Sequence, residues 1–132
     1  MGAAPDQVVD QCPFEPVVEL VFDRWTSHVL WTLATKGRLR FSELHAQLHA
    51  ITPRVLTERL RKLERDGFLR RSYYREIPPR VEYEITQLAE TLIPAFRVLA
   101  DWSAAHLDEV HAAQRRYDAE NQARIHIGPA SD

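Results

Sequence analysis

Basic side chains gather in one part of the chain, and the chemistry that they suit is the binding of phosphate. Residues 51–71, ITPRVLTERLRKLERDGFLRR, contain seven lysines and arginines. Residues 36–80 carry twelve basic and five acidic side chains, a net charge of +7, whereas the remainder carries −9, which together give the −2 of the whole chain. A positive zone of this kind suits a polyanion, but an accidental cluster on a solvated surface would have the same composition.

The sequence offers no arrangement of residues for catalysis, for a metal or for a cofactor. It has no glycine-rich phosphate loop, no nucleophile elbow and no pair of catalytic acids. His45 and His49 stand four residues apart, a spacing that could hold one metal ion, and His106 and His111 add two imidazoles. No carboxylate or cysteine completes a ligand set with them. We therefore expect a protein without enzymatic activity, bound metal or cofactor.

Length and composition favour a single cytoplasmic domain. The chain has 132 residues, which suits one domain with one core. No run of about 18 apolar residues is present, so neither a transmembrane helix nor a membrane partner is expected. The N-terminal sequence MGAAPDQVVDQCPFEP lacks the basic and apolar segments of a secretory signal. The single cysteine, Cys12, cannot form an intramolecular disulfide, and a reducing cytoplasm is the expected location.

Two helices are expected before residue 38. Residues 1–11 have the composition of a flexible arm. From Phe14 to Phe22 the apolar residues recur at spacings of three and four, which predicts a short amphipathic helix. Ser27 is a candidate N-cap for the second helix, and Gly37 stands in the usual terminating position.

The next segment has the pattern of a helix-turn-helix. Residues 38–41 alternate and form a candidate short strand, and Ser42 is a candidate cap for a third helix. Thr52 followed by Pro53 is a favourable start for a fourth helix, which Gly67 is expected to end. In a helix-turn-helix the second helix is the one that enters the major groove of duplex DNA.

Beyond the fourth helix the hydrophobic period changes from about 3.6 residues to 2. Aromatic and β-branched residues in 68–74 and 81–86 predict two strands. Pro78 and Pro79 forbid a helix between the strands and stiffen their connection. The hairpin of residues 68–86, with its protruding loop, is the expected wing.

A long helix is expected from Gln87 to about Tyr117, with a kink or a new start at Pro94. Residues 118–132 have little to pack against and are expected to form a mobile tail. The expected fold is mainly α with a small β-hairpin wing (α+β), a winged helix-turn-helix domain that covers residues 12–117.

The faces of the fourth helix separate expected core residues from expected contact residues. Four apolar side chains share one stripe and are expected to be buried: Val55, Leu56, Leu60 and Leu63. Arginine can bind guanine with two hydrogen bonds, and glutamate can accept one from cytosine, so the candidates for base edges are Arg54, Thr57, Glu58 and Arg61. The candidates for phosphate contacts are Thr52, Lys62, Arg65, Arg75 and Arg80. A salt-bridged solvated surface is the alternative, but intrahelical pairs worth ~0.3 kcal/mol each hardly explain the excess of positive charge.

Several motifs together resemble one family of bacterial regulators. The motifs are CPFEPVVELVFDRW, LRFSELHAQLHAITPRVLTERLRKLERDGFLRR, PPRVEYEIT followed by LAETLIPAF, and ADW. From Cys12 to Trp102, about two thirds of the chain, the sequence is similar to the HxlR-type winged helix-turn-helix transcriptional regulators. It departs from them at Phe22, Asp23 and Arg24, where members often have small residues or glycine, and in the longer extension beyond Trp102.

The resemblance implies a homodimer that binds an operator with inverted half-sites and regulates transcription, and we expect a repressor. Two-fold symmetry would place the half-sites ~34 Å apart on duplex DNA. The first and last helices would form the dimer interface, through Phe14, Val18, Leu92, Phe96, Leu99 and Trp102.

The resemblance also implies a sensing role for Cys12, because several relatives use the cysteine of the CP opening to detect electrophiles or oxidants. Cys12 precedes an expected helix N-terminus, whose dipole favours a thiolate, although Asp10 and Glu15 oppose it. An inert, partly buried thiol is the alternative. A small-molecule effector pocket is a further alternative to core or interface packing for the three tryptophans, Trp25, Trp31 and Trp102.

Two other functions stay open from the sequence alone. A winged-helix domain can also contact proteins, and the positive face of residues 53–80 would then meet an acidic partner. Salt dependence separates this alternative from binding to DNA, because phosphate contacts make affinity fall steeply with salt. A small enzyme would need a cofactor for which the sequence offers no site.

Overall fold

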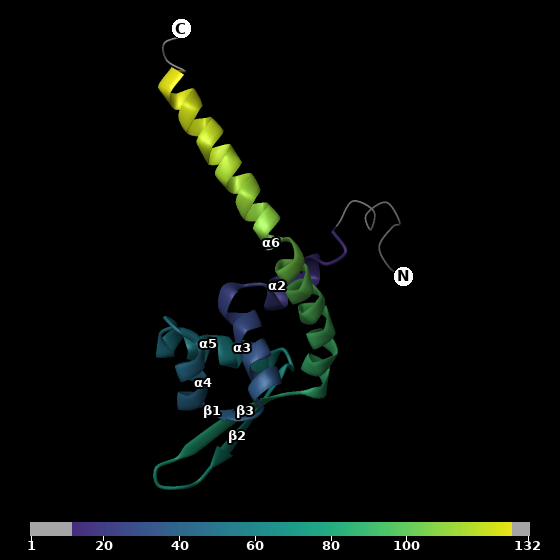
Figure 1. Ribbon diagram of the computed structural model, residues 1–132. Helices are drawn as coiled ribbons and strands as arrows, with labels where there is room; N and C mark the ends of the chain where they lie inside the picture. Colours follow the sequence, from purple (N-terminus) through teal and green to yellow (C-terminus); the bar gives the residue numbers. More distant parts are fainter. Residues whose placement is uncertain (1–11, 128–132) are drawn as a thin grey trace. The chain divides into compact units, whose positions relative to one another are not determined.

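Helices and a few short strands make up residues 12–127, the part of the chain that the computed structural model describes (Figure 1). In chain order the elements are α2 (Glu15–Val21), α3 (Arg24–Lys36), β1 (Leu39–Arg40), α4 (Phe41–Gln47), α5 (Pro53–Arg65), β2 (Leu69–Tyr74), β3 (Arg80–Ile85) and α6 (Gln87–Ile127). This order, with one small antiparallel sheet, confirms the expected winged helix-turn-helix. The expected flexible arm, residues 1–11, and the last part of the expected tail, residues 128–132, lie outside the described residues.

The start of α3 differs from the prediction, because Asp23 caps the helix in place of Ser27. The Asp23 carboxylate accepts hydrogen bonds from the backbone N–H groups of Trp25 and Thr26, at 3.0 and 2.8 Å, and a third from the Thr26 hydroxyl. Ser27 instead donates its hydroxyl to the Asp23 carbonyl at 3.3 Å. Burial of Asp23 opposes its ionisation, but the Thr26 hydrogen bonds and the charge of Arg59 outweigh that effect and lower its pKa.

The helix-turn-helix consists of α4 and α5. Ser42 does not cap α4, because the helix begins at Phe41 and Ser42 is already its second residue. At this end Glu43 accepts a hydrogen bond from the Arg40 backbone N–H at 2.8 Å. Thr52 caps α5 as predicted, accepting from the Val55 N–H at 3.2 Å. The predicted end is also confirmed: Gly67 lies just beyond α5 with a φ of 86°, a left-handed conformation that glycine adopts without strain.

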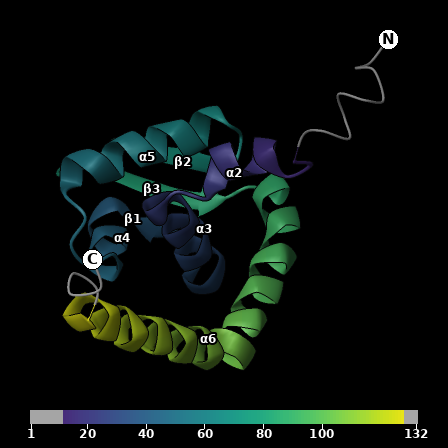
Figure 2. The same ribbon diagram turned by 90° about the horizontal axis from the view of Figure 1, so that it is seen from above.

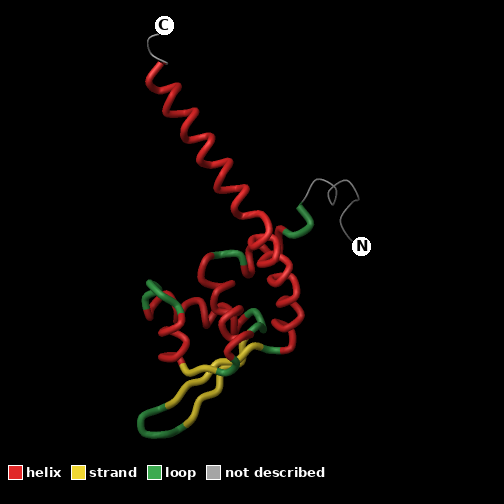
Figure 3. The backbone as a smooth tube through the Cα atoms, viewed as in Figure 1, coloured by secondary structure: helices red, strands yellow, loops and turns green. Residues whose placement is uncertain are grey.

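The wing is a β-hairpin within a three-stranded antiparallel sheet of order β1-β3-β2 (Figure 3). Strand β2 pairs with β3 from Leu69 opposite Ile85 to Tyr74 opposite Arg80, which confirms the predicted hairpin. The candidate strand at 38–41 is confirmed as β1, which pairs with the other side of β3. The sheet therefore connects the wing to the segment that enters α4.

Helix α5 packs against both α3 and β2 (Figure 2). The large apolar side chains that are almost completely buried are Val21, Val29, Leu30, Leu33, Leu44, Leu56, Leu60 and Leu63. Of the four α5 residues predicted to be buried, Leu56, Leu60 and Leu63 are confirmed, whereas Val55 is only half-buried. The buried stripe thus orients α5, because its opposite face must point to solvent.

Helix α6 is continuous through Pro94 and extends to Ile127, ten residues past its predicted end at Tyr117. The chain divides into two compact units at this proline, Met1–Ile93 and Pro94–Asp132. In the second unit most of the helix is exposed, including the large apolar side chains Val98, Leu99, Trp102, Leu107, Tyr117 and Ile125. Among residues 12–127 no helix has both the length and the apolar character needed to cross a membrane.

Candidate nucleic-acid interface

The exposed face of α5 begins with Arg54, in its first turn. The Arg54 side chain is 90% exposed, and its Nε lies 3.5 Å from a carboxylate oxygen of Glu58, one turn further along. An exposed pair of this kind contributes little to stability because water screens it. Arg54 and Glu58 can therefore separate at little cost and turn to a ligand.

Thr57 and Arg61 continue this face toward the hairpin. Thr57 is half-buried and donates its hydroxyl to the Pro53 carbonyl at 2.8 Å, so only its remaining surface is available. Arg61 is exposed and lines a cavity of about 250 Å³ between α5 and the hairpin, together with Thr57, Glu64, Arg71 and Tyr83. Burial is the main reason that the pKa of Tyr83 is raised, and the charge of Arg71 opposes this.

Three arginines of this surface carry positive charge that the protein does not neutralise locally. Within residues 12–127 no carboxylate forms an ion pair with Arg61, Arg65 or Arg75. All three are exposed: two lie on α5 and the third in the loop of the hairpin. They are the strongest candidates for phosphate or base contacts that the geometry offers.

Lys62 was predicted to face outward, but its ammonium is held within the protein. Its ammonium donates to the backbone carbonyl of Leu20 at 2.9 Å and to the Asp66 carboxylate at 3.1 Å. Arg59, one turn earlier, lies 3.5 Å from the Asp23 carboxylate. Since both cations are engaged within the protein, the assignment of Lys62 to phosphate is not kept.

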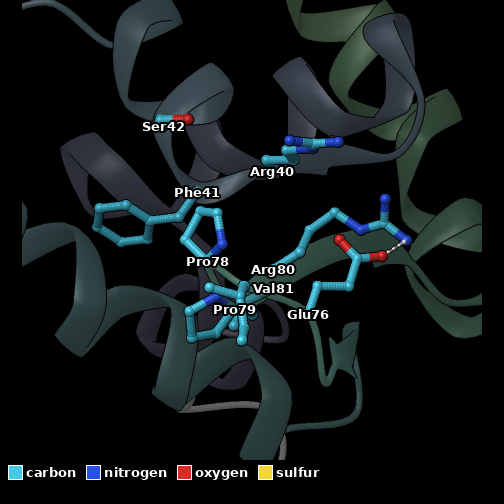
Figure 4. Close-up of a pocket in the computed structure, with 9 residues that line it drawn as sticks. Arg40, Phe41, Ser42, Glu76, Pro78, Pro79, Arg80 and Val81 are labelled. Atoms are coloured by element: carbon cyan, nitrogen blue, oxygen red, sulfur yellow. Dashed lines mark ion pairs between the residues drawn. The ribbon is translucent and has the colours of Figure 1, made fainter.

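Arg80 is also held within the protein, although it lies at the loop end of the wing, opposite Tyr74. Its guanidinium lies 3.2 Å from Glu76 (Figure 4). It also lies 3.3 Å from Glu82 and stacks 4.1 Å above the Tyr74 ring. Because Arg80 contacts three side chains of the hairpin, it can reach a phosphate only by leaving these partners. Arg75 is the better placed of the two predicted wing contacts.

The outer face of the sheet carries a network of ion pairs that reduces the predicted positive zone. Arg38 binds Glu84 at 2.9 Å and Glu82 at 3.5 Å, and Arg70 binds Glu84 at 3.2 Å. The Arg38 and Arg70 hydrogen bonds lower the pKa of the Glu84 carboxyl. These two glutamates follow the segment 36–80, and including them lowers its net charge from +7 to +5.

A cavity of about 440 Å³ lies between the start of α4 and the wing loop (Figure 4). Its lining includes Arg40, Phe41, Pro78 and Arg80.

The described residues contain no group of three histidine, cysteine, aspartate or glutamate side chains placed to hold a metal ion. His45, which the sequence offered as a possible metal ligand, instead has its Nε2 2.9 Å from the carbonyl oxygen of Ile51.

Cys12 and most of the predicted interface residues are exposed. The Cys12 side chain is exposed, and its carbonyl accepts the Glu15 N–H at 3.1 Å, just before α2. Phe14, just before α2, is 62% exposed, and Val18, within α2, is 44% exposed. On α6, Leu99 and Trp102 are about half exposed, Leu92 is half-buried and Phe96 is buried.

Sequence reasoning did not find the inward contacts of Arg59 and Lys62. One local signal existed, because Asp66 follows Lys62 at the spacing of a helical ion pair. The contact to Leu20 joins residues 42 positions apart and ends on a backbone carbonyl, so no sequence pattern marks it.

The fold and this surface define a winged helix-turn-helix protein. The sequence profile described as HxlR-like helix-turn-helix matches residues 20–111. The chain is 34% identical over 111 residues to the uncharacterized HTH-type transcriptional regulator YdeP of Bacillus subtilis (strain 168), covering 84% of this chain and 86% of that one. It is 43% identical over 91 residues to an uncharacterized HTH-type transcriptional regulator of Methanothermobacter thermautotrophicus (strain ATCC 29096 / DSM 1053 / JCM 10044 / NBRC 100330 / Delta H), covering 69% of each.

Among solved structures, the redox regulator HypR in its reduced form superposes with a TM-score of 0.71 at 31% identity, covering 76% of this chain and 99% of that one. The chain belongs to the HxlR-like helix-turn-helix family, and it is a DNA-binding transcriptional regulator of the winged-helix type.

Proposed function

We propose that the protein is a homodimeric repressor that binds an inverted-repeat operator through α5 and the wing. Arg54, Thr57, Glu58 and Arg61 face the base edges of the major groove in this proposal. Thr52, Arg65 and Arg75 contact phosphates, with Arg80 holding the wing in shape. The observation that carries it is the exposed, locally unneutralised charge of Arg61, Arg65 and Arg75 on the helix and wing that bind DNA in this fold.

Equilibrium binding to duplex DNA, measured as a function of salt, tests this proposal. Fragments selected from a random duplex pool should bind much more tightly than unselected duplex. Each phosphate neutralised should contribute about −0.9 to the slope of log affinity against log salt. No preference for any duplex, together with a flat salt response, would favour the alternative of an acidic protein partner. Transcription from a promoter that contains the selected site should decrease if the protein is a repressor.

The proposed dimer is formed by a second copy of the chain, which covers exposed apolar side chains of the first and last helices. At the first helix these are Phe14, just before α2, and Val18, within it. On α6 they are Leu99 and Trp102, beside the more buried Leu92 and Phe96. Exposed aromatic residues such as Phe14 and Trp102 are frequent anchors of interfaces. Sedimentation equilibrium should give twice the mass of the chain, and a monomer at micromolar concentration would contradict the proposed symmetry.

Modification of Cys12 is expected to weaken operator binding, because Cys12 is exposed and lies three residues before the start of α2, where its carbonyl accepts the Glu15 N–H. The proposal extends to this chain the redox role that the name of HypR states for that protein. Since Cys12 is the only cysteine, a thiol reagent can only add an adduct or join two chains. Titration of operator DNA with untreated and iodoacetamide-treated protein would measure the change. Cys12→Ser should be insensitive, and an unchanged affinity of the treated protein would refute the sensing role.

Arg75→Ala and Arg80→Ala should weaken DNA binding in different ways. Loss of Arg75 removes one phosphate contact, so the salt slope should decrease by about 0.9 while base preference stays the same. Arg80 is occupied by Glu76, Glu82 and Tyr74, so its loss should disorder the wing and lower the melting temperature as well. Thermal unfolding beside salt-dependent binding distinguishes the two. An Arg80→Ala protein with normal stability and a reduced slope would show that Arg80 contacts phosphate directly.

A further inference from the structure

Two basic residues of α5 connect this helix to the corner between α2 and α3. Lys62 donates to the carbonyl oxygen of Leu20, in the last turn of α2, at 2.9 Å. Arg59 forms an ion pair at 3.5 Å with Asp23, the residue that caps the start of α3. One face of α5 thus holds the end of one helix and the beginning of the next.

The contact from Lys62 supplies what the end of α2 lacks. The last carbonyl groups of a helix have no partner within the helix, and the negative end of its dipole favours a nearby cation. Helix α2 has no basic residue in its own last turn. Lys62 provides both the donor and the charge from a residue 42 positions away, and Asp66 holds its ammonium from the other side at 3.1 Å.

The contact from Arg59 reaches the neighbouring helix through the carboxylate that caps it. The Asp23 carboxylate already accepts two backbone N–H groups at the start of α3, so it cannot move without uncapping that helix. Arg59 is two-thirds buried, and its Nε is shielded from water without a hydrogen bond of good geometry. The Nε side of its guanidinium therefore lies against Asp23.

We infer that Lys62 and Arg59 are positioning residues, which fix the orientation of α5 against the α2–α3 corner and so set how its exposed arginines approach DNA. The inference rests on the proposed function of α5, because orientation matters only if Arg54, Arg61 and Arg65 contact DNA. Neither Lys62 nor Arg59 contacts phosphate. A displacement of α2 reaches α5 through the Leu20 carbonyl.

The test compares three single variants of the full chain. Lys62→Met keeps the aliphatic stem and the helix propensity and removes only the ammonium. Lys62→Arg restores a cation that can again reach a carbonyl. Arg65→Ala is the matched control, since it removes a neighbouring α5 cation that is exposed and has no ion pair within residues 12–127. Each variant is measured by amide hydrogen exchange of peptides covering 15–26 and by salt-dependent binding to the selected duplex.

Lys62→Met should increase exchange in 15–26 about five- to tenfold, as expected for loss of one partly exposed hydrogen bond at a helix end. Its DNA affinity should decrease severalfold with the salt slope of the unmodified protein, and Lys62→Arg should recover most of both losses. Arg65→Ala should leave exchange in 15–26 unchanged and reduce the slope by about 0.9.

A Lys62→Met protein with normal exchange in 15–26 and a reduced salt slope would overturn the inference, because Lys62 would then be a phosphate contact. If neither the unmodified protein nor any variant binds duplex DNA in a salt-dependent way, the proposed function fails. The exchange measurement still decides whether Lys62 stabilises the α2–α3 corner: unchanged exchange in Lys62→Met overturns that link, and increased exchange supports it.

Discussion

Replacing Leu60 by alanine is expected to lower the free energy of unfolding by about 2–5 kcal/mol, the largest effect on stability that we predict. Leu60 is 1% exposed and lies between Leu56 and Leu63 on the buried stripe of α5, which packs against α3 and β2. Removal of its branched side chain loses apolar burial and leaves a cavity at the point where helix and sheet meet. Urea unfolding followed by circular dichroism, at one fixed protein concentration, measures the change.

Arg65→Ala is the matched control on the same helix. Arg65 is exposed and forms no ion pair within residues 12–127, and alanine is a good helix former, so its stability should change by about 0.5 kcal/mol or less. A Leu60→Ala protein that loses less than about 1 kcal/mol would mean that α5 is not anchored by this stripe. The outward orientation of Arg54 and Arg61 would then lose its physical basis.

The parts of the fold that sequence predicted well are those set by local signals. Thr52 and Pro53 begin α5, and Gly67 ends it, because the capping hydroxyl, the missing proline N–H and the left-handed glycine act over a few residues. The hairpin follows from the change of hydrophobic period and the two prolines of its loop. Each of these signals has one dominant structural outcome.

Competing local signals gave the wrong helix starts. Both Asp23 and Ser27 can cap a helix, and the carboxylate prevailed because it accepts from Trp25 and Thr26 together. At α4 the predicted cap Ser42 was displaced by Glu43, which reaches back to a backbone N–H. The spacing of side chains that accept hydrogen bonds did not discriminate between these alternatives.

The end of α6 and the pairing of charges could not be found by the same reasoning. Residues 118–127 contain good helix formers and no glycine or proline, so nothing in them stops a helix. The mobile tail was expected because these residues have little to pack against. The partners of Lys62 and Arg59 are set by tertiary packing. A positive segment in the sequence therefore overstates the charge that the folded surface offers to DNA.

Arg54→Ala is expected to relax base preference at one position of each half-site by about 1–3 kcal/mol, with a smaller loss of affinity for unselected duplex. Arg54 is in the first turn of α5, where helices of this motif meet base edges, and its side chain is 90% exposed. Its only partner among the described residues, Glu58, holds it through a weak exposed pair. Competition between the selected duplex and variants changed at single base pairs measures the preference.

Two further variants separate the reading of bases from simple attraction. Arg54→Lys keeps the charge but cannot form the paired hydrogen bonds of a guanidinium, so it should retain affinity and lose discrimination. Arg65→Ala should weaken every duplex alike and leave the preference intact. If Arg54→Ala instead weakens all sequences equally, Arg54 contacts phosphate, and base reading must begin at Glu58 and Arg61. The first turn of α5 would then lie over the phosphate backbone, and only the second turn would reach the base edges of the major groove.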